Sequence, residues 1–272
     1  MTAASLVLSD IYIYPVKSLG GIRVTEATVE PRGLRHDRRW LIVDERNQFM
    51  TQRQTSEMAL LKVLPAYNGF LITHSARPEM LPLYVPFEAT PERTLFVTIW
   101  DDMVFAWRGT PEADAWVSEA LGRSCKLVYM SDMVMRPTDD GEVPGNVSFA
   151  DAYPFLLVGQ ASLDELNSRL PEALPMNRFR PNLVFGGGQP YEEESWRNFR
   201  IGELLFEGIR PCGRCAVTTI DQQTAQKSAE PLRTMAPYRT QGGKVMFGQN
   251  VTGPGSGTLR LGDTLVVQST LA

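Results

Sequence analysis

Residues 210–221 read RPCGRCAVTTID and hold two of the three cysteines in the chain. Cysteine is the softest metal ligand and among the most reactive nucleophiles of the protein side chains. The β-branched run that follows the pair, at residues 216–220, predicts a strand. The function of Cys212 and Cys215 therefore depends on which other residues converge on this segment.

The composition is that of an ordinary soluble protein. The chain has 272 residues, of which 43% are hydrophobic and 21% charged, with a net charge of −4. This length allows one large domain or two small ones. The acidic balance argues against broad nucleic-acid binding, and no apolar run approaches the ~18–20 residues that span a bilayer. The N-terminus lacks a basic leader and cysteines are few, so we expect free thiols and a cytoplasmic location.

Strand patterns dominate the first hundred residues. Short alternating or β-branched runs, separated by turn residues, occur at residues 5–14, 22–30, 40–44, 60–64, 69–73, 94–100 and 103–108. Many short strands at this spacing favour antiparallel sheets or a barrel.

Helices are predicted at only a few places. Residues 111–121 form one helix, with Thr110 as its N-cap and Gly122 as its stop. Residues 162–170 form another, opened by a capping box at Ser162. Hairpins are predicted at residues 199–209 and 257–268. The predicted fold class is mainly β with a few helices (α+β).

The cysteine pair allows four interpretations. A structural zinc site needs four ligands, and only Cys125 and two histidines, His36 and His74, remain to complete it. A thioredoxin-type dithiol requires a helix after the pair, whereas a strand is predicted there. One cysteine could instead bind a soft metal held mainly by another molecule. The simplest alternative is two small buried residues at the start of a strand.

Cations recur at predicted strand ends in both halves of the chain. Lys17 lies in Tyr14-Pro15-Val16-Lys17-Ser18, Arg38 in the basic run at residues 33–40, and Arg180 in residues 177–182. Guanidinium groups suit bidentate phosphate binding, and a lysine acts as a point charge. Each cation alone is more simply a solvated surface charge. Together, in an acidic protein, they predict one anionic ligand.

The same segments resemble a known family. In the first half they are Tyr14-Pro15-Val16-Lys17-Ser18, Gly33-Leu34-Arg35 with Asp37-Arg38, and the segment around Arg53. In the second half they are Asp151 with Pro154-Phe155-Leu156-Leu157, Ala161-Ser162-Leu163, Leu166-Asn167, Phe179-Arg180-Pro181-Asn182 and residues 212–221. They resemble the MOSC N-terminal β-barrel domain and the MOSC domain, over nearly the whole chain. The combination of Arg-Pro-Asn with Cys-x-x-Cys-x-x-Thr-Thr is specific.

The resemblance implies two domains and one cofactor. An N-terminal β-barrel-like domain, residues 1–125, would pack on a MOSC β-barrel domain, residues 126–272. The molybdenum cofactor (molybdopterin) would bind as in the amidoxime-reducing component and its bacterial relatives. The resemblance makes Cys215 the metal ligand. It assigns the pterin phosphate and dithiolene tail to Lys17, Ser18, Arg38, Arg180 and Asn182.

The resemblance also implies catalytic residues. Cys215 would be one, and Asp151 corresponds to an acidic residue beside the metal. Ala152-Tyr153 departs from the small hydroxylic residues that the amidoxime-reducing proteins carry there. Arg214 is expected to lower the pKa of the ligating thiol. Cys212 would support the site, and Cys125 would be core packing.

The function implied is that of a molybdenum-dependent oxidoreductase that reduces N-hydroxylated compounds: hydroxylamines, amidoximes and N-hydroxylated bases. Electrons would come from a separate donor protein of the ferredoxin, flavoprotein or cytochrome type, because the chain has no plant-type C-x4-C-x2-C run. One alternative is a non-catalytic molybdenum cofactor or sulfur carrier of the sulfurase C-terminal type, and another is a metal-free dithiol redox protein. Neither a membrane nor a specific nucleic acid is expected as a partner.

Overall fold

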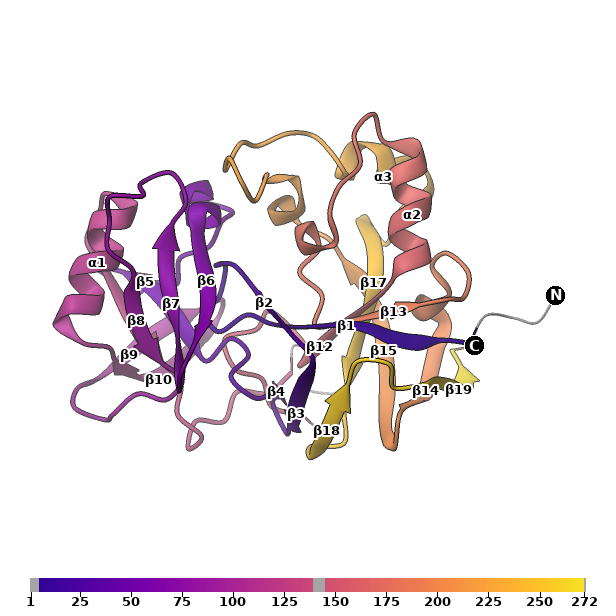
Figure 1. The fold of residues 1–272 in the computed structure, drawn as a ribbon, viewed down its shortest axis with the longest axis horizontal. Helices are drawn as coiled ribbons and strands as arrows, with labels where there is room; N and C mark the ends of the chain where they lie inside the picture. Colours follow the sequence, from indigo (N-terminus) through magenta and orange to yellow (C-terminus); the bar gives the residue numbers. More distant parts are fainter. Residues whose placement is uncertain (1–4, 139–144, 272) are drawn as a thin grey trace.

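The computed structural model describes residues 5–138 and 145–271, and most of its regular structure is β-strand. Figure 1 shows two lobes, with strands from the N-terminal end of the chain passing between them. The prediction of a mainly β fold with a few helices is confirmed, since the described residues contain three α-helices. None of the described helices is long and apolar enough to cross a membrane.

The largest sheet joins the two ends of the chain. Its strands lie in the order β19 (Leu265–Thr270), β14 (Trp196–Ile201), β15 (Leu204–Gly213), β17 (Lys244–Thr252), β12 (Phe155–Gly159), β13 (Leu183–Gly186), β1 (Val7–Ile13) and β2 (Ile22–Val24), with β16 (Thr240–Gln241) paired to β17. Among the described strands of this sheet, only β12 and β13 pair in parallel, and α2 (Gln160–Arg169) connects them. An isolated bridge joins Val7 of β1 to Thr264, just before β19, but no continuous ladder follows, so the sheet is not a closed barrel.

The other lobe contains two smaller sheets and a helix. One sheet has the order β5 (Trp40–Asp44), β11 (Cys125–Tyr129), β10 (Asp102–Arg108) and β9 (Thr94–Ile99). The other has the order β6 (Leu61–Ala66), β7 (Gly69–His74) and β8 (Leu83–Pro86). The predicted helix is α1 (Pro111–Leu121). The Thr110 hydroxyl accepts from the backbone of Ala113, and Gly122 ends the helix at φ 64°.

A third small sheet pairs segments from opposite ends of the sequence. It has the order β18 (Gly257–Arg260), β3 (Glu26–Glu30) and β4 (Gly33–Leu34). Strand pairing therefore joins segments from both sides of residue 125. The domain boundary predicted at that residue stays a prediction. The hairpin predicted at residues 257–268 is wrong, because β18 pairs with β3 while β19 pairs with β14.

One hydrophobic cluster continues through both lobes. It includes Phe70 and Leu127 in one lobe and Phe155 and Phe199 in the other, all less than 3% exposed. Burying this much apolar surface in a single cluster ties the lobes together. The remaining short elements cover the larger sheet or connect strands: η1 (Ser56–Leu60), η2 (Met176–Arg178), η3 (Glu192–Ser195), η4 (Ala216–Thr219) and α3 (Leu232–Arg239).

The strand predicted after the cysteine pair is wrong, because residues 216–219 form the 3-10 turn η4. The Thr218 hydroxyl donates to the Cys215 carbonyl at 3.0 Å, and the Thr219 hydroxyl donates to the Ala216 carbonyl at 2.8 Å. Such local hydrogen bonds compete with strand pairing for threonine-rich segments.

The capping box predicted at Ser162 is also wrong. Helix α2 begins earlier, at Gln160, and the Ser162 hydroxyl donates to the fully buried Glu193 at 2.9 Å. The same carboxylate accepts from the Gly159 backbone at 3.1 Å, so Glu193 supports the start of α2 in place of a capping box.

This carboxylate gives a pH-dependent stability. Burial raises the pKa of Glu193 to about 7, although hydrogen bonds from Gly159 and Ser162 act in the opposite direction. A folded-state pKa above the unfolded value of 4.5 gives stability that is present at low pH and lost as the pH rises through 7. When the pH rises from 5 to 8, the free energy of unfolding of wild type should fall by up to about 3 kcal/mol relative to that of Glu193→Gln. Denaturant unfolding at the two pH values measures this difference. The exposed Glu92→Gln is the control, and an equal difference at both pH values would contradict this assignment.

Candidate functional site

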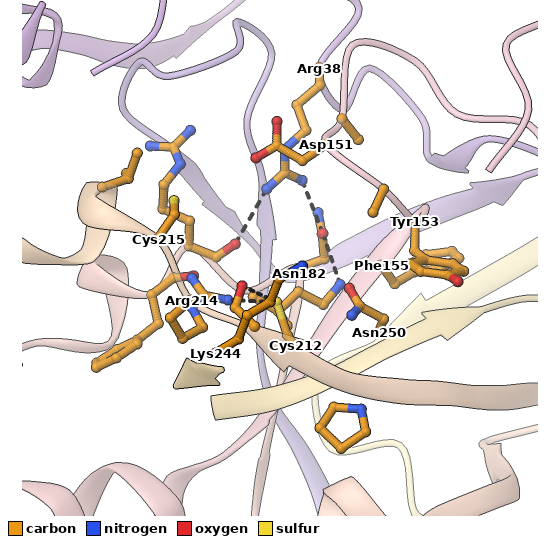
Figure 2. Close-up of a pocket in the computed structure, with 18 of the residues that line it drawn as sticks. Arg38, Asp151, Tyr153, Phe155, Asn182, Cys212, Arg214, Cys215, Lys244 and Asn250 are labelled. Atoms are coloured by element: carbon orange, nitrogen blue, oxygen red, sulfur yellow. Dashed lines mark hydrogen bonds between the residues drawn. The ribbon is translucent and has the colours of Figure 1, made fainter. Parts of the chain in front are cut away.

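The predicted site residues all line one cavity of about 510 Å³. This volume lies in the usual range for small-molecule sites. The structure brings together Lys17, Ser18, Arg38, Asp151, Arg180, Asn182 and Cys215, from both halves of the chain. Figure 2 labels Arg38, Asp151, Asn182 and Cys215 among them. Their convergence is a finding of the structure, whereas their individual roles stay predictions.

Two arginines meet at the ring of the buried Tyr14. The guanidinium carbon of Arg38 lies 4.6 Å from the ring centroid, and that of Arg180 lies 4.3 Å from it. Arg38 also donates to Asn182 Oδ1 at 3.0 Å and pairs with Asp37. Burial and the neighbouring Arg38 lower the pKa of Arg180 to about 10. Two guanidinium groups this close form a site that favours an anion.

The backbone near this arginine pair is strained. Ser18, Arg38 and Arg180 have φ values of 66°, 50° and 56°. These values lie in the left-handed region, which residues other than glycine, asparagine and aspartate rarely adopt. Such conformations cost roughly 1–3 kcal/mol each and cluster at binding sites. Their coincidence with three predicted cofactor-binding residues supports a binding function for this part of the cavity.

Asn182 occupies a supporting position. Its Oδ1 accepts from Arg38 and from the Leu156 backbone at 3.3 Å, and its Nδ2 donates to the Tyr12 carbonyl at 3.2 Å. Because the side chain is 1% exposed, these contacts fix the direction of the Arg38 guanidinium. Asn182 thus reaches the cavity mainly through the arginine that it orients.

Asp151 lies between two cations. It pairs with the Lys17 ammonium, and its Oδ2 accepts from Arg53 Nη2 at 2.8 Å. Partial burial acts to raise the pKa of Asp151, but Lys17 and Arg53 outweigh it and hold that pKa well below its usual range. Burial lowers the pKa of Lys17 to about 8, against the effect of Asp151. Lys17 also donates to the Phe149 carbonyl at 2.7 Å, so two of its three donors are used.

The two cysteines lie in different surroundings. Cys212, near the end of β15, accepts from Arg214 Nη1 at 3.1 Å. Cys215 precedes η4, where its carbonyl caps the turn and its side chain lines the cavity. The structure therefore places Arg214 against Cys212, contrary to its expected contact with the other thiol. Arg53 takes the place beside Cys215, and Asp151 and Cys215 raise the pKa of Arg53 against the effect of burial.

The other interpretations of the pair gain little from the structure. No group of three or more histidine, cysteine, aspartate or glutamate side chains within residues 5–138 and 145–271 could hold a metal. The element after Cys215 is a four-residue turn, not the helix of a thioredoxin-type site. Cys125 is 3% exposed in the core, and burial raises its pKa to about 11, which confirms its prediction as core packing.

The segment around Arg53 was named from the sequence only as part of the resemblance, and its role in joining the parts of the site was missed. Gln52 Nε2 donates to the Ser18 carbonyl at 2.6 Å, and the Gln52 and Gln222 amides form a reciprocal pair at 3.1 and 2.9 Å. The next residue, Arg53, contacts Asp151. The available signal was the polar run at residues 51–57, between the apolar residues 49–50 and 58–61. Their partners lie up to 170 residues away, so no local pattern identifies them.

The cavity wall formed by β15 and β17 was also missed, apart from Cys212. It contains Arg210, Cys212, Lys244, Met246 and Asn250, contributed by the neighbouring strands β15 and β17. Tyr153, where the sequence departs from the amidoxime-reducing pattern, is 5% exposed, and its ring lies 5.3 Å from the Arg210 guanidinium. A buried tyrosine therefore stands where the resemblance implies a small hydroxylic residue.

Comparison with known proteins gives matches over most of the chain. A family model described as the MOSC N-terminal beta barrel domain matches residues 5–124, and one described as the MOSC domain matches residues 144–266. Mitochondrial amidoxime-reducing component 1 of Mus musculus is 31% identical over 94% of this chain and 80% of its own length. Its Homo sapiens counterpart is 30% identical over 94% of this chain and 81% of its own length.

A second group of relatives is longer than this chain. The molybdenum cofactor sulfurase of Arabidopsis thaliana is 32% identical over 89% of this chain but only 32% of its own length. The chain thus spans about a third of the sulfurases that it matches.

The arginine pair predicts oxyanion binding that can be measured without any cofactor. Saturating inorganic phosphate should raise the melting temperature of the protein by about 2–5 °C, relative to potassium chloride at the same ionic strength. Arg180→Gln should abolish most of this rise, whereas the exposed Arg23→Gln should keep it. An equal rise in Arg180→Gln and wild type would show that phosphate binds elsewhere.

Proposed function

Because the chain belongs to the MOSC family, we propose that it binds the molybdenum cofactor in this cavity and reduces N-hydroxylated compounds. The observation that carries the proposal is a cavity that holds a thiol, Cys215, together with the arginine pair Arg38 and Arg180. One soft ligand and one anion site in a shared cavity match a metal delivered by a phosphorylated organic cofactor.

The residues present fit such a cofactor. Arg38, Arg180 and Ser18 would hold its phosphate, with Lys17 adding one further donor, and Cys215 would supply a thiolate to the metal. The protein has no multi-residue metal site of its own within its described residues, so the metal would depend on the cofactor's other ligands. The strained backbone of the phosphate-facing residues fits the same interpretation.

When bound, the cofactor supplies two-electron chemistry, while the chain supplies binding, orientation and electrostatics. Reduction of a hydroxylamine consumes two electrons and two protons, breaks the N–O bond, and yields an amine and water. Asp151 would hold Arg53 at the reacting end of the cavity and would also orient Lys17 toward the cofactor. Its low pKa keeps it ionised at neutral pH, so it orients these cations and does not itself donate a proton.

Electrons would reach the site from a separate protein donor of the ferredoxin, flavoprotein or cytochrome type. The relatives named for amidoxime reduction support the reductase, and the sulfurases support the alternative of a cofactor or sulfur carrier. The reductase is preferred because the matched amidoxime-reducing relatives are covered over four-fifths of their length. In the carrier, Cys215 would hold cofactor or sulfur without turnover.

The reductase is tested with benzamidoxime as substrate and reduced methyl viologen as donor. Protein from a cofactor-competent host should contain nearly one molybdenum per chain and should form benzamidine. Cys215→Ala should lose both, whereas Cys212→Ala should keep most of both. Molybdenum without turnover would favour the carrier, and a reversible disulfide without molybdenum would favour the dithiol protein.

A further inference from the structure

Trp100 has an unusual backbone for a large side chain. Ile99 pairs with Asp102 across the β9–β10 hairpin, so Trp100 occupies a two-residue turn. Its φ of 53° lies in the left-handed region. Asparagine and glycine are favoured at such turn positions, and a bulky residue there is a genuine outlier. The hairpin between β6 and β7 follows this preference, since Asn68 adopts its φ of 52°.

Core packing does not explain the strain at Trp100. The residue is 42% exposed and belongs to none of the three hydrophobic clusters. Its ring lies 4.9 Å from Phe49 and 4.7 Å from the guanidinium of Arg53, and it lines the cavity. A strained residue that persists without burial points to a local function.

Arg53 connects this ring to the reacting end of the cavity. Its Nη2 donates to Asp151 Oδ2 at 2.8 Å, and it lies beside Cys215. Only 23% of its side chain is exposed, so the guanidinium is enclosed by Trp100 and by residues of the cavity. Trp100 thus restricts the guanidinium of Arg53, which contacts Asp151.

We infer that Trp100 and Arg53 form a positioning unit that fixes Asp151 and the Cys215 side chain for the cofactor. The inference rests on the proposed function for its activity readout. Trp100 limits the orientations of Arg53 by stacking. Arg53 fixes Asp151 by an ion pair and a hydrogen bond, and it acts on the Cys215 side chain by charge. The backbone strain of Trp100 is retained because only the turn position directs the ring over Arg53.

The test compares four variants loaded with cofactor in the same host. Trp100→Asn suits the left-handed backbone but removes the ring, so it should melt within about 2 °C of wild type. It should keep its molybdenum yet lose on the order of tenfold in kcat. In Arg53→Gln, kcat should fall on the order of a hundredfold, because a displacement of reacting groups by about 1 Å has an effect of this size. Arg53→Lys should recover part of that loss, since it keeps the charge without the planar fork.

Two further readouts separate positioning from general stability. The electron paramagnetic resonance spectrum of the molybdenum centre should change in Trp100→Asn and Arg53→Gln. It should stay unchanged in Phe96→Asn, which removes an exposed aromatic residue from β9 away from Arg53. Loss of molybdenum from Arg53→Gln at an unchanged melting temperature would equally support the inference.

Two failures can be told apart. If the wild type carries no molybdenum or reduces no benzamidoxime, the proposed function is wrong. If wild type is loaded and active, but Trp100→Asn and Arg53→Gln match Phe96→Asn in rate and spectrum, the positioning unit is wrong.

Discussion

The constraint on which the site depends is the repulsion among seven cations that line one cavity. They are Lys17, Arg38, Arg53, Arg180, Arg210, Arg214 and Lys244. Among the described lining residues Asp151 is the only carboxylate. It contacts Lys17 and Arg53, while Asp37 and the Tyr14 ring stabilise Arg38. The positive potential that remains suits an anionic ligand, which would supply the missing negative charge.

The fold meets this constraint by drawing the cations from distant segments. Lys17 and Arg38 precede β5 in the sequence, and Arg180 lies between η2 and β13. Strands β15 and β17 form another wall of the cavity. The Gln52–Gln222 amide pair joins the first of these segments to the turn after Cys215. Since β1 lies beside β13 and β3 beside β18, neither half of the chain could form the cavity alone.

The sequence allowed the fold class and the composition of the site to be predicted, but not the contacts within it. Alternating strands and the Thr110 and Gly122 caps are local signals, and the structure agrees with them. The strand prediction for residues 216–220 was wrong because the hydroxyls of Thr218 and Thr219 donate hydrogen bonds to nearby backbone carbonyls. The strand propensity of these residues does not take such local hydrogen bonds into account. The partner of β18 could not be predicted, because pairing with β3 depends on distant packing. Arg53 beside Cys215, in place of Arg214, is a tertiary contact of the same kind.

The central claim is that Cys215 gives its sulfur to a metal whose cofactor is held by the arginine pair. Molybdenum K-edge X-ray absorption of purified wild type and Cys215→Ser tests this most directly, because it counts sulfur neighbours of the metal without requiring turnover. The account predicts one more sulfur neighbour in wild type than in any molybdenum that Cys215→Ser retains. An identical sulfur shell in the two proteins, at similar molybdenum content, would contradict it.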